Sequence, residues 1–128
     1  KVIDMEAMFA GCCSLVKLNL KSFDTKNVDN MRVMFNDCAS LISLDLSGFN
    51  TKNLCNISYM FYNCKSLMFL DISNFNAQYG VSMDSLFYNC NSLICIKLDN
   101  FNIKNSVESI FFDCNSLPKN IINNFVDI

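Results

Sequence analysis

Residues 23–48 read FDTKNVDNMRVMFNDCASLISLDLSG, and residues 49–74 repeat the pattern as FNTKNLCNISYMFYNCKSLMFLDISN. Residues 75–100, FNAQYGVSMDSLFYNCNSLICIKLDN, form another unit of the same length, 26 residues. In each unit a phenylalanine is followed three residues later by a cysteine, and a Ser-Leu pair comes soon after. Repeats of about 20 to 50 residues are typical of proteins in which each unit packs on its neighbours. The sequence therefore predicts a repeat protein.

Two incomplete units flank the three complete ones. Residues 1–22 match the latter part of a unit and are counted as the first unit, so 23–48, 49–74 and 75–100 are the second, third and fourth. Residues 101–128 match a shortened unit. We expect the shortened unit to be a C-terminal repeat or cap, because Pro118 removes a backbone donor and proline is tolerated at a sheet edge. The 128 residues are thus predicted to form one repeat domain. Met5 falls at the repeat position of Met31, so the chain starts inside a unit, and we expect it to be a fragment of a longer chain.

Within a unit the apolar spacing changes partway. In the second unit a first group recurs at intervals typical of one face of a helix: Val28, Met31, Met34, Phe35 and Cys38. Further along, Leu44 and Leu46 alternate with polar residues, which predicts a short, half-buried strand. Stacking such units would give an α/β solenoid, a right-handed stack like a leucine-rich repeat. Its parallel β-sheet would lie on the concave side and its short helices on the other side.

Composition excludes several functional classes. The chain has 10 Lys and Arg against 12 Asp and Glu, without a basic cluster, so we expect no nucleic-acid partner. No apolar run reaches the roughly 18 to 20 residues of a membrane-spanning helix, so we expect no direct membrane insertion by this segment. Histidine is absent, which removes the commonest general base and zinc ligand. We therefore predict that the chain is not an enzyme and has no catalytic, cofactor-binding or metal-ligating residues.

The recurring string MFxxCxSLxxLDLSxFNTxNVxxM is present almost intact from Met34 through Ile57. It resembles the BspA-like leucine-rich-repeat surface proteins, in the variety with a 26-residue unit. That resemblance implies a secreted or surface-displayed module, used by bacteria and protists for adhesion or for contact with host or environmental molecules. It implies no catalytic residues.

The sequence contains eight cysteines, and five of them share one repeat position: Cys12, Cys38, Cys64, Cys90 and Cys114. Because cysteine behaves as a compact apolar residue, we predict a row of buried thiols. Disulfides between adjacent units are an alternative, although five members leave one unpaired. A metal site is not expected without histidine or a CxxC pair. Cys13, Cys55 and Cys95 lie off the row, and Cys95 should point out of the sheet. Free cysteines fit an extracellular location poorly.

The outward positions of the predicted strands are the candidates for partner binding, because they can vary without harming the core. Seven of them form the hypothetical site: Lys17, Asn19, Asp45, Phe69, Asp71, Lys97 and Asp99. Their mixed charges suit a protein or carbohydrate ligand, and Phe69 is the candidate anchor. Asp45 and Asp71 should be neighbours on an open face and keep ordinary pKa values, so we expect neither acid–base catalysis nor a calcium site there.

Two functions follow from these observations. The first is a non-catalytic recognition or adhesion module that binds through the concave strand face and belongs to a protein at the cell surface or outside the cell. The alternative is an intracellular structural or scaffolding subunit that binds through its helical side or the end of the stack.

Overall fold

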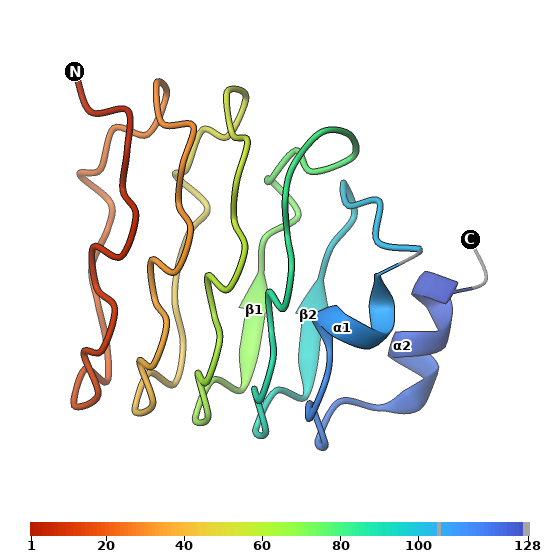
Figure 1. Cartoon of the computed structure of the whole chain (residues 1–128). Coiled ribbons are helices and arrows are strands. Elements are labelled where there is room, and N and C mark those ends of the chain that lie inside the picture. The colour runs from red at the N-terminus through yellow and green to blue at the C-terminus, as the bar shows by residue number, and fades with distance from the viewer. Residues whose placement is uncertain (105, 127–128) are drawn as a thin grey trace.

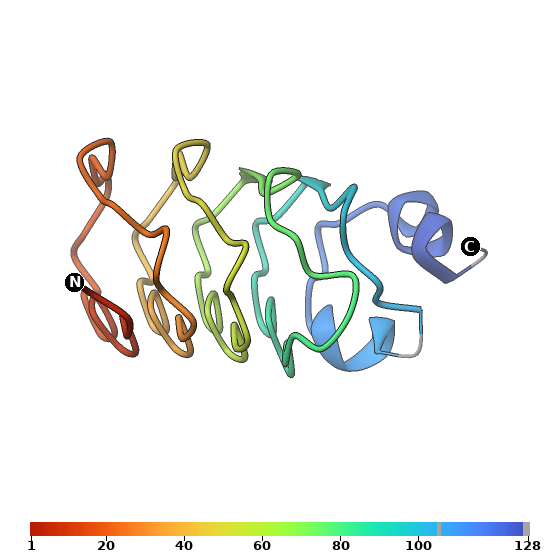
Figure 2. The same ribbon diagram turned by 90° about the horizontal axis from the view of Figure 1, so that it is seen from above.

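The chain has the predicted repeat fold. In a computed structural model, which describes residues 1–104 and 106–126, successive units lie side by side along one direction (Figure 1). Seen from above, the units form loops of similar outline, each beside the next (Figure 2). The regular elements are two strands, β1 (Phe69–Asp71) and β2 (Cys95–Lys97), and two helices, α1 (Val107–Ile110) and α2 (Lys119–Val126).

Strands β1 and β2 are parallel, and their register joins residues 26 apart. Phe69 pairs with Cys95, and Asp71 pairs with Lys97. At the equivalent position of the second unit, the described chain forms one parallel bridge to the third unit, between Ser43 and Phe69, and no strand. The prediction of a strand in every unit is therefore wrong for the described part of the chain, because the earlier units have too few successive bridges to form one.

Turns replace the helices predicted in the complete units. The N–H groups of Met31, Val33 and Phe35 donate to carbonyl groups of the next unit at 2.9, 3.0 and 2.9 Å. Between them, the N–H of Met34 donates to the carbonyl of Met31 at 3.2 Å, a bond that closes a tight turn. An α-helix would use all these groups internally. Tight turns also return an apolar side chain to the same side every three residues, so the sequence pattern imitates a helix.

Left-handed backbone conformations recur in these turns at two positions of each complete unit. One position holds Asp37, Asn63 and Asn89, whose φ angles lie at 59° to 60°. Asn and Asp tolerate this conformation because their short polar side chains hydrogen-bond locally. The other position holds Val33 in the second unit, with φ at 51°. For a β-branched residue such a φ angle is strained.

Replacing Val33 with asparagine is therefore expected to raise the free energy of unfolding by about 0.5 to 1 kcal/mol, because asparagine enters the left-handed region at lower cost. Urea unfolding would measure the change. Val16→Asn is the matched control, because Val16 is 45% exposed and does not have a positive φ. An equal gain in both variants would contradict the backbone explanation.

The core is built from rows of identical side chains. One row of stacked rings runs through the molecule with centroid distances of 5.5 to 5.9 Å: Phe9, Phe35, Phe61, Phe87, Phe111 and Phe125. A second row, Phe23, Phe49 and Phe75, has spacings of 6.5 and 6.3 Å. Each unit thus buries its apolar face against equivalent residues of the next, which one unit could not achieve alone.

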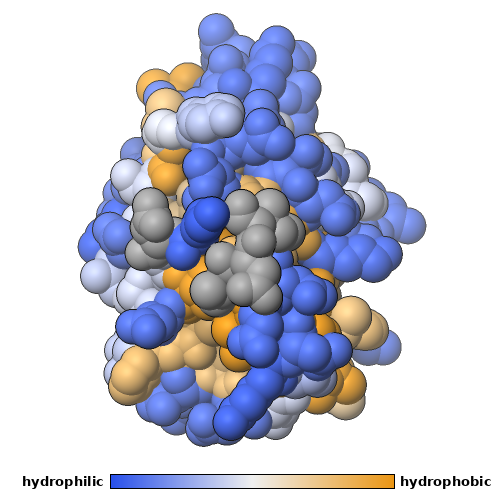
Figure 3. All heavy atoms as spheres, turned by 90° about the vertical axis from the view of Figure 1, so that its right-hand side faces the viewer, coloured by the Kyte–Doolittle hydropathy of each residue, from blue (hydrophilic) through white to orange (hydrophobic). Residues whose placement is uncertain are grey.

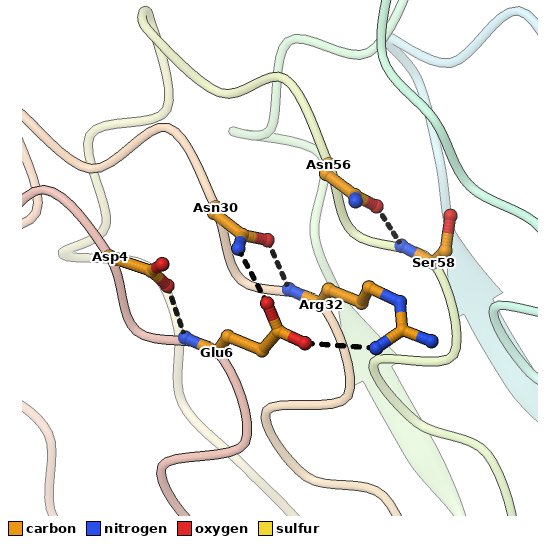
Figure 4. Close-up of polar contacts among 6 residues, drawn as sticks. All are labelled: Asp4, Glu6, Asn30, Arg32, Asn56 and Ser58. Atoms are coloured by element: carbon orange, nitrogen blue, oxygen red, sulfur yellow. Dashed lines mark hydrogen bonds and ion pairs between the residues drawn. The ribbon is translucent and has the colours of Figure 1, made fainter.

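Polar side chains also join the units on the turn side (Figure 4). Asn30 and Asn56 each accept a hydrogen bond from the N–H two residues later, at 3.0 and 2.9 Å, and so fix the start of a turn. Asn30 and Arg32 also donate to the carboxylate of Glu6 in the preceding unit, both at 2.9 Å. Asn30 therefore both shapes its own turn and ties that turn to the preceding unit.

The last unit departs from the others by forming helices. The carbonyl of Pro118 accepts from the N–H of Ile121 at 3.0 Å, and α2 begins at Lys119. Phe125 then stacks on Phe111 at 5.9 Å. Apolar side chains remain visible among polar ones on this side of the molecule (Figure 3). Within residues 1–104 and 106–126, neither helix has the length and apolar character needed to cross a membrane.

Candidate binding groove on the strand side

A groove of about 540 Å³ lies on the strand side of the second, third and fourth units. Four of the predicted site residues line it: Asp45, Phe69, Asp71 and Lys97. Between them lie small polar side chains, Ser43, Ser47, Ser73 and Asn74, with Cys95 at one side. Buried leucines complete the lining, namely Leu44, Leu46 and Leu70. The groove therefore combines an apolar base with a charged and polar rim.

Phe69 is the largest side chain of this surface. The strand register places it opposite Cys95, and a single bridge places it beside Ser43. Phe69 is 45% exposed, and the neighbouring residues at this position, Ser43 and Cys95, are small. A large, rigid, partly exposed ring between small residues is the kind of side chain that anchors a binding partner.

Asp45 and Asp71 have the same local geometry. Each accepts from a serine hydroxyl two residues later at 2.6 Å, Ser47 for Asp45 and Ser73 for Asp71. These bonds, with the serine N–H groups, lower the pKa of Asp45 and lower the pKa of Asp71 to about 2. The expectation of ordinary pKa values is wrong, because the serines stabilise the ionised form. Both carboxylates are charged at neutral pH and neither can serve there as an acid.

The charges of the groove are only partly paired. Lys97 Nζ lies 3.1 Å from Asp71 Oδ2, and this contact raises the pKa of Lys97. Asp45 forms no ion pair with any residue that the structure describes. The groove thus presents one neutralised pair and one carboxylate available to a partner.

Three predicted residues lie outside the groove. Lys17 and Asn19 are exposed on the first unit, where Asn19 accepts from the N–H of Lys21 at 3.1 Å. Asp99 follows β2 and is also absent from the lining. Sequence reasoning missed Asn74, which lines the groove and donates to the carbonyls of Leu46 and Phe49 at 3.0 and 3.1 Å. The sequence did contain a signal for this residue, because asparagine ends both the third unit (Asn74) and the fourth unit (Asn100).

A second surface feature was also missed. One repeat position places an exposed apolar residue on each of four successive units: Val16, Ile42, Met68 and Ile94. We call these four residues the apolar row. They directly precede the outward strand positions, so the row borders the groove. The signal in the sequence was the apolar residue that directly follows the Ser-Leu pair in four units. The strand alternation begins after this residue and therefore does not predict whether it is buried or exposed.

Comparison with known proteins identifies the family. Residues 1–101 match the profile described as "Mycoplasma protein of unknown function, DUF285". The chain belongs to the DUF285 family. No curated protein matches this DUF285 chain. The crystal structure of a leucine-rich-repeat protein from T. pallidum resembles it with 16% identity and a TM-score of 0.48, over 97% of this chain and 77% of that one.

The cysteines of this DUF285 protein are all free. Four of them are buried, and each donates to a phenylalanine carbonyl of the preceding unit at 3.0 to 3.2 Å: Cys38, Cys64, Cys90 and Cys114. Burial raises their pKa values, to about 11 for Cys38 and Cys114. The expectation that Cys12 is buried with them is wrong, because no unit of the described chain covers its outer side.

Thiol titration should divide these cysteines into two equal classes. Cys12, Cys13, Cys55 and Cys95 are exposed, so an aromatic disulfide reagent should react rapidly with four thiols in the native protein. The four buried thiols should react only after unfolding, because the thiolate is the reactive form and burial opposes its formation. Rapid native reaction of more than four thiols would contradict the burial of the row.

Proposed function

We propose that this chain is a non-catalytic recognition module that binds a protein or glycan partner through the strand-side groove. The observation that carries the proposal is the convergence of Asp45, Phe69, Asp71 and Lys97 around one concavity. A partly exposed ring supplies contact area, and Asp45, which forms no ion pair with the described residues, supplies specificity. Lys17, Asn19 and Asp99 extend the same face beyond the groove in this proposal.

The finer description of the fold belongs to the same proposal. We infer a right-handed, leucine-rich-repeat-like solenoid with the strand row on its concave side, built from units at 23–48, 49–74 and 75–100 between two partial ones. The parallel register of β1 and β2 and the stacked phenylalanines support it. Display at the cell surface is inferred from the resemblance of the repeat motif to BspA-like surface proteins.

Charge reversal tests the groove. The double variant Asp45→Lys with Asp71→Lys should lose capture from an array of immobilised matrix proteins and glycans, because both carboxylates on the groove change sign. Asp29→Lys with Asp84→Lys is the matched control, since both residues are exposed and lie outside the groove. Thermal unfolding of each variant would exclude loss of structure. Equal capture by the wild type and the groove variant would contradict the proposal.

A second candidate is favoured by the eight free cysteines. An intracellular scaffolding subunit would keep its thiols reduced. It would bind through the end of the stack or through the side opposite the strands. The sequence predicted helices on that side, and the structure has turns there. Protein isolated from its cells with thiols trapped at lysis would distinguish the two: mixed disulfides at the exposed cysteines favour display, and complete reduction favours the scaffold.

A further inference from the structure

The apolar row is a continuous exposed surface rather than scattered residues. Val16, Ile42, Met68 and Ile94 are 45%, 44%, 45% and 45% exposed. The N–H of each of the last three donates to the carbonyl of the preceding member, at 3.3, 3.1 and 2.9 Å, so no residue intervenes between neighbours. Phe69, which follows Met68, joins the row to the groove. Apolar patches rimmed by polar groups are typical of protein–protein contacts, and aliphatic side chains offer a sugar no hydrogen bonds.

The spacing of the row selects the kind of partner segment. Adjacent parallel strands lie about 4.8 Å apart, and a helix advances about 5.4 Å per turn. Over the three steps of the row the mismatch with a helix is roughly 2 Å. An extended strand repeats its side chains about every 6.7 Å, so its mismatch is roughly 6 Å. A helix lying along the stack can therefore place one apolar residue over each member of the row.

The charged residues beside the row indicate which charge the partner helix should carry next to its apolar face. Asp71 is already paired with Lys97, and Asp45 has no ion-pair partner among residues 1–104 and 106–126. A basic side chain opposite Asp45 would complete the pairing. Helix α2 of the same chain is already packed through Phe125.

We propose that the apolar row docks an amphipathic helix of another protein, with apolar residues one turn apart and a lysine or arginine beside them that faces Asp45. This inference rests on the proposed function and names its partner class. The helix runs along the stack, its apolar face on Ile42, Met68 and Ile94, and its basic flank toward the groove.

A peptide pair tests this directly. The probe is a synthetic peptide of about 18 residues, long enough to be helical, with leucine at each turn and arginine on one flank. The control peptide has the same composition in an order without helical periodicity. Fluorescence anisotropy should show binding at least about tenfold tighter for the amphipathic peptide. Equal binding of the two peptides, or none, would overturn the proposal.

Variants then locate the contact. Met68→Asp should weaken the amphipathic peptide at least about tenfold, whereas Tyr79→Asp should not, because Tyr79 is exposed and belongs neither to the row nor to the groove lining. Asp45→Lys should weaken the arginine peptide and favour one with glutamate on that flank. If groove variants abolish capture on the array while Met68→Asp changes neither capture nor peptide binding, the proposed function stands and the helix inference fails.

Discussion

Replacing Phe61 with alanine is expected to lower the free energy of unfolding by about 3 to 5 kcal/mol, the range for removing a fully buried ring. Phe61 is completely buried and stacks on Phe35 at 5.7 Å and on Phe87 at 5.5 Å. The substitution removes the middle of the phenylalanine row, so two units lose contacts with their neighbours. Few substitutions in the chain should cost more.

Urea unfolding of the two proteins would measure the loss. Phe69→Ala is the matched control, because it removes the same ring from a position that is 45% exposed on the strand side. We expect the control to lower the free energy of unfolding by less than about 1 kcal/mol. Similar losses in both variants would mean that the Phe61 ring is not in the core.

Alkaline pH should destabilise the protein steeply. The four buried thiols have raised pKa values because burial opposes their ionisation, with about 11 for Cys38 and Cys114 against an ordinary 9.0. At about pH 7, well below the ordinary pKa, these thiols are protonated in both states and stability does not depend on their titration. As pH rises through 9 to 11, the unfolded chain releases protons that the folded chain retains. Each thiol should then remove up to about 1.4 kcal/mol per pH unit.

Equilibrium unfolding between pH 8 and about 10.5 would give the slope of stability against pH. Cys64→Ser removes one titrating group while keeping a donor for the Phe35 carbonyl, which Cys64 now contacts at 3.2 Å. Its slope should be smaller by the contribution of one thiol, whatever its stability at pH 7. Cys55→Ser is the matched control, because it makes the same chemical change at an exposed cysteine outside the buried row. Equal slopes in the wild type and Cys64→Ser would contradict burial of Cys64.

The repeat and much of the core could be predicted from the sequence, because residues of the same type recur at a fixed spacing along the chain. Phe35, Phe61 and Phe87 share one position, and they stack. The helices could not be distinguished from turns, because both return side chains every three or four residues. The difference lies in the hydrogen bonds: the N–H of Phe35 donates to Met60 in the next unit. A partner so distant in the sequence leaves no local pattern.

Only part of the candidate site could be predicted, because a local pattern in the sequence shows which way a side chain points but not the shape of the surface. Alternation along each strand identified Asp45, Phe69 and Asp71 as outward, and all three line the groove. Alternation does not reveal where the surface is hollow, so Lys17 and Asp99 were included although they lie outside it. The shifted pKa values of the two carboxylates depend on serine hydroxyls at 2.6 Å, which required side-chain geometry.

The most direct test of this account is the arrangement of the buried sulfur atoms. In crystals of the protein, an anomalous difference map at long wavelength would locate the Sγ atoms without reference to any assumed fold. We predict that the Sγ atoms of Cys38, Cys64 and Cys90 lie on one line, separated by about 5 Å as adjacent parallel strands are. Sulfur positions scattered through the molecule, without a common line or spacing, would contradict the stacking on which the core and the groove depend.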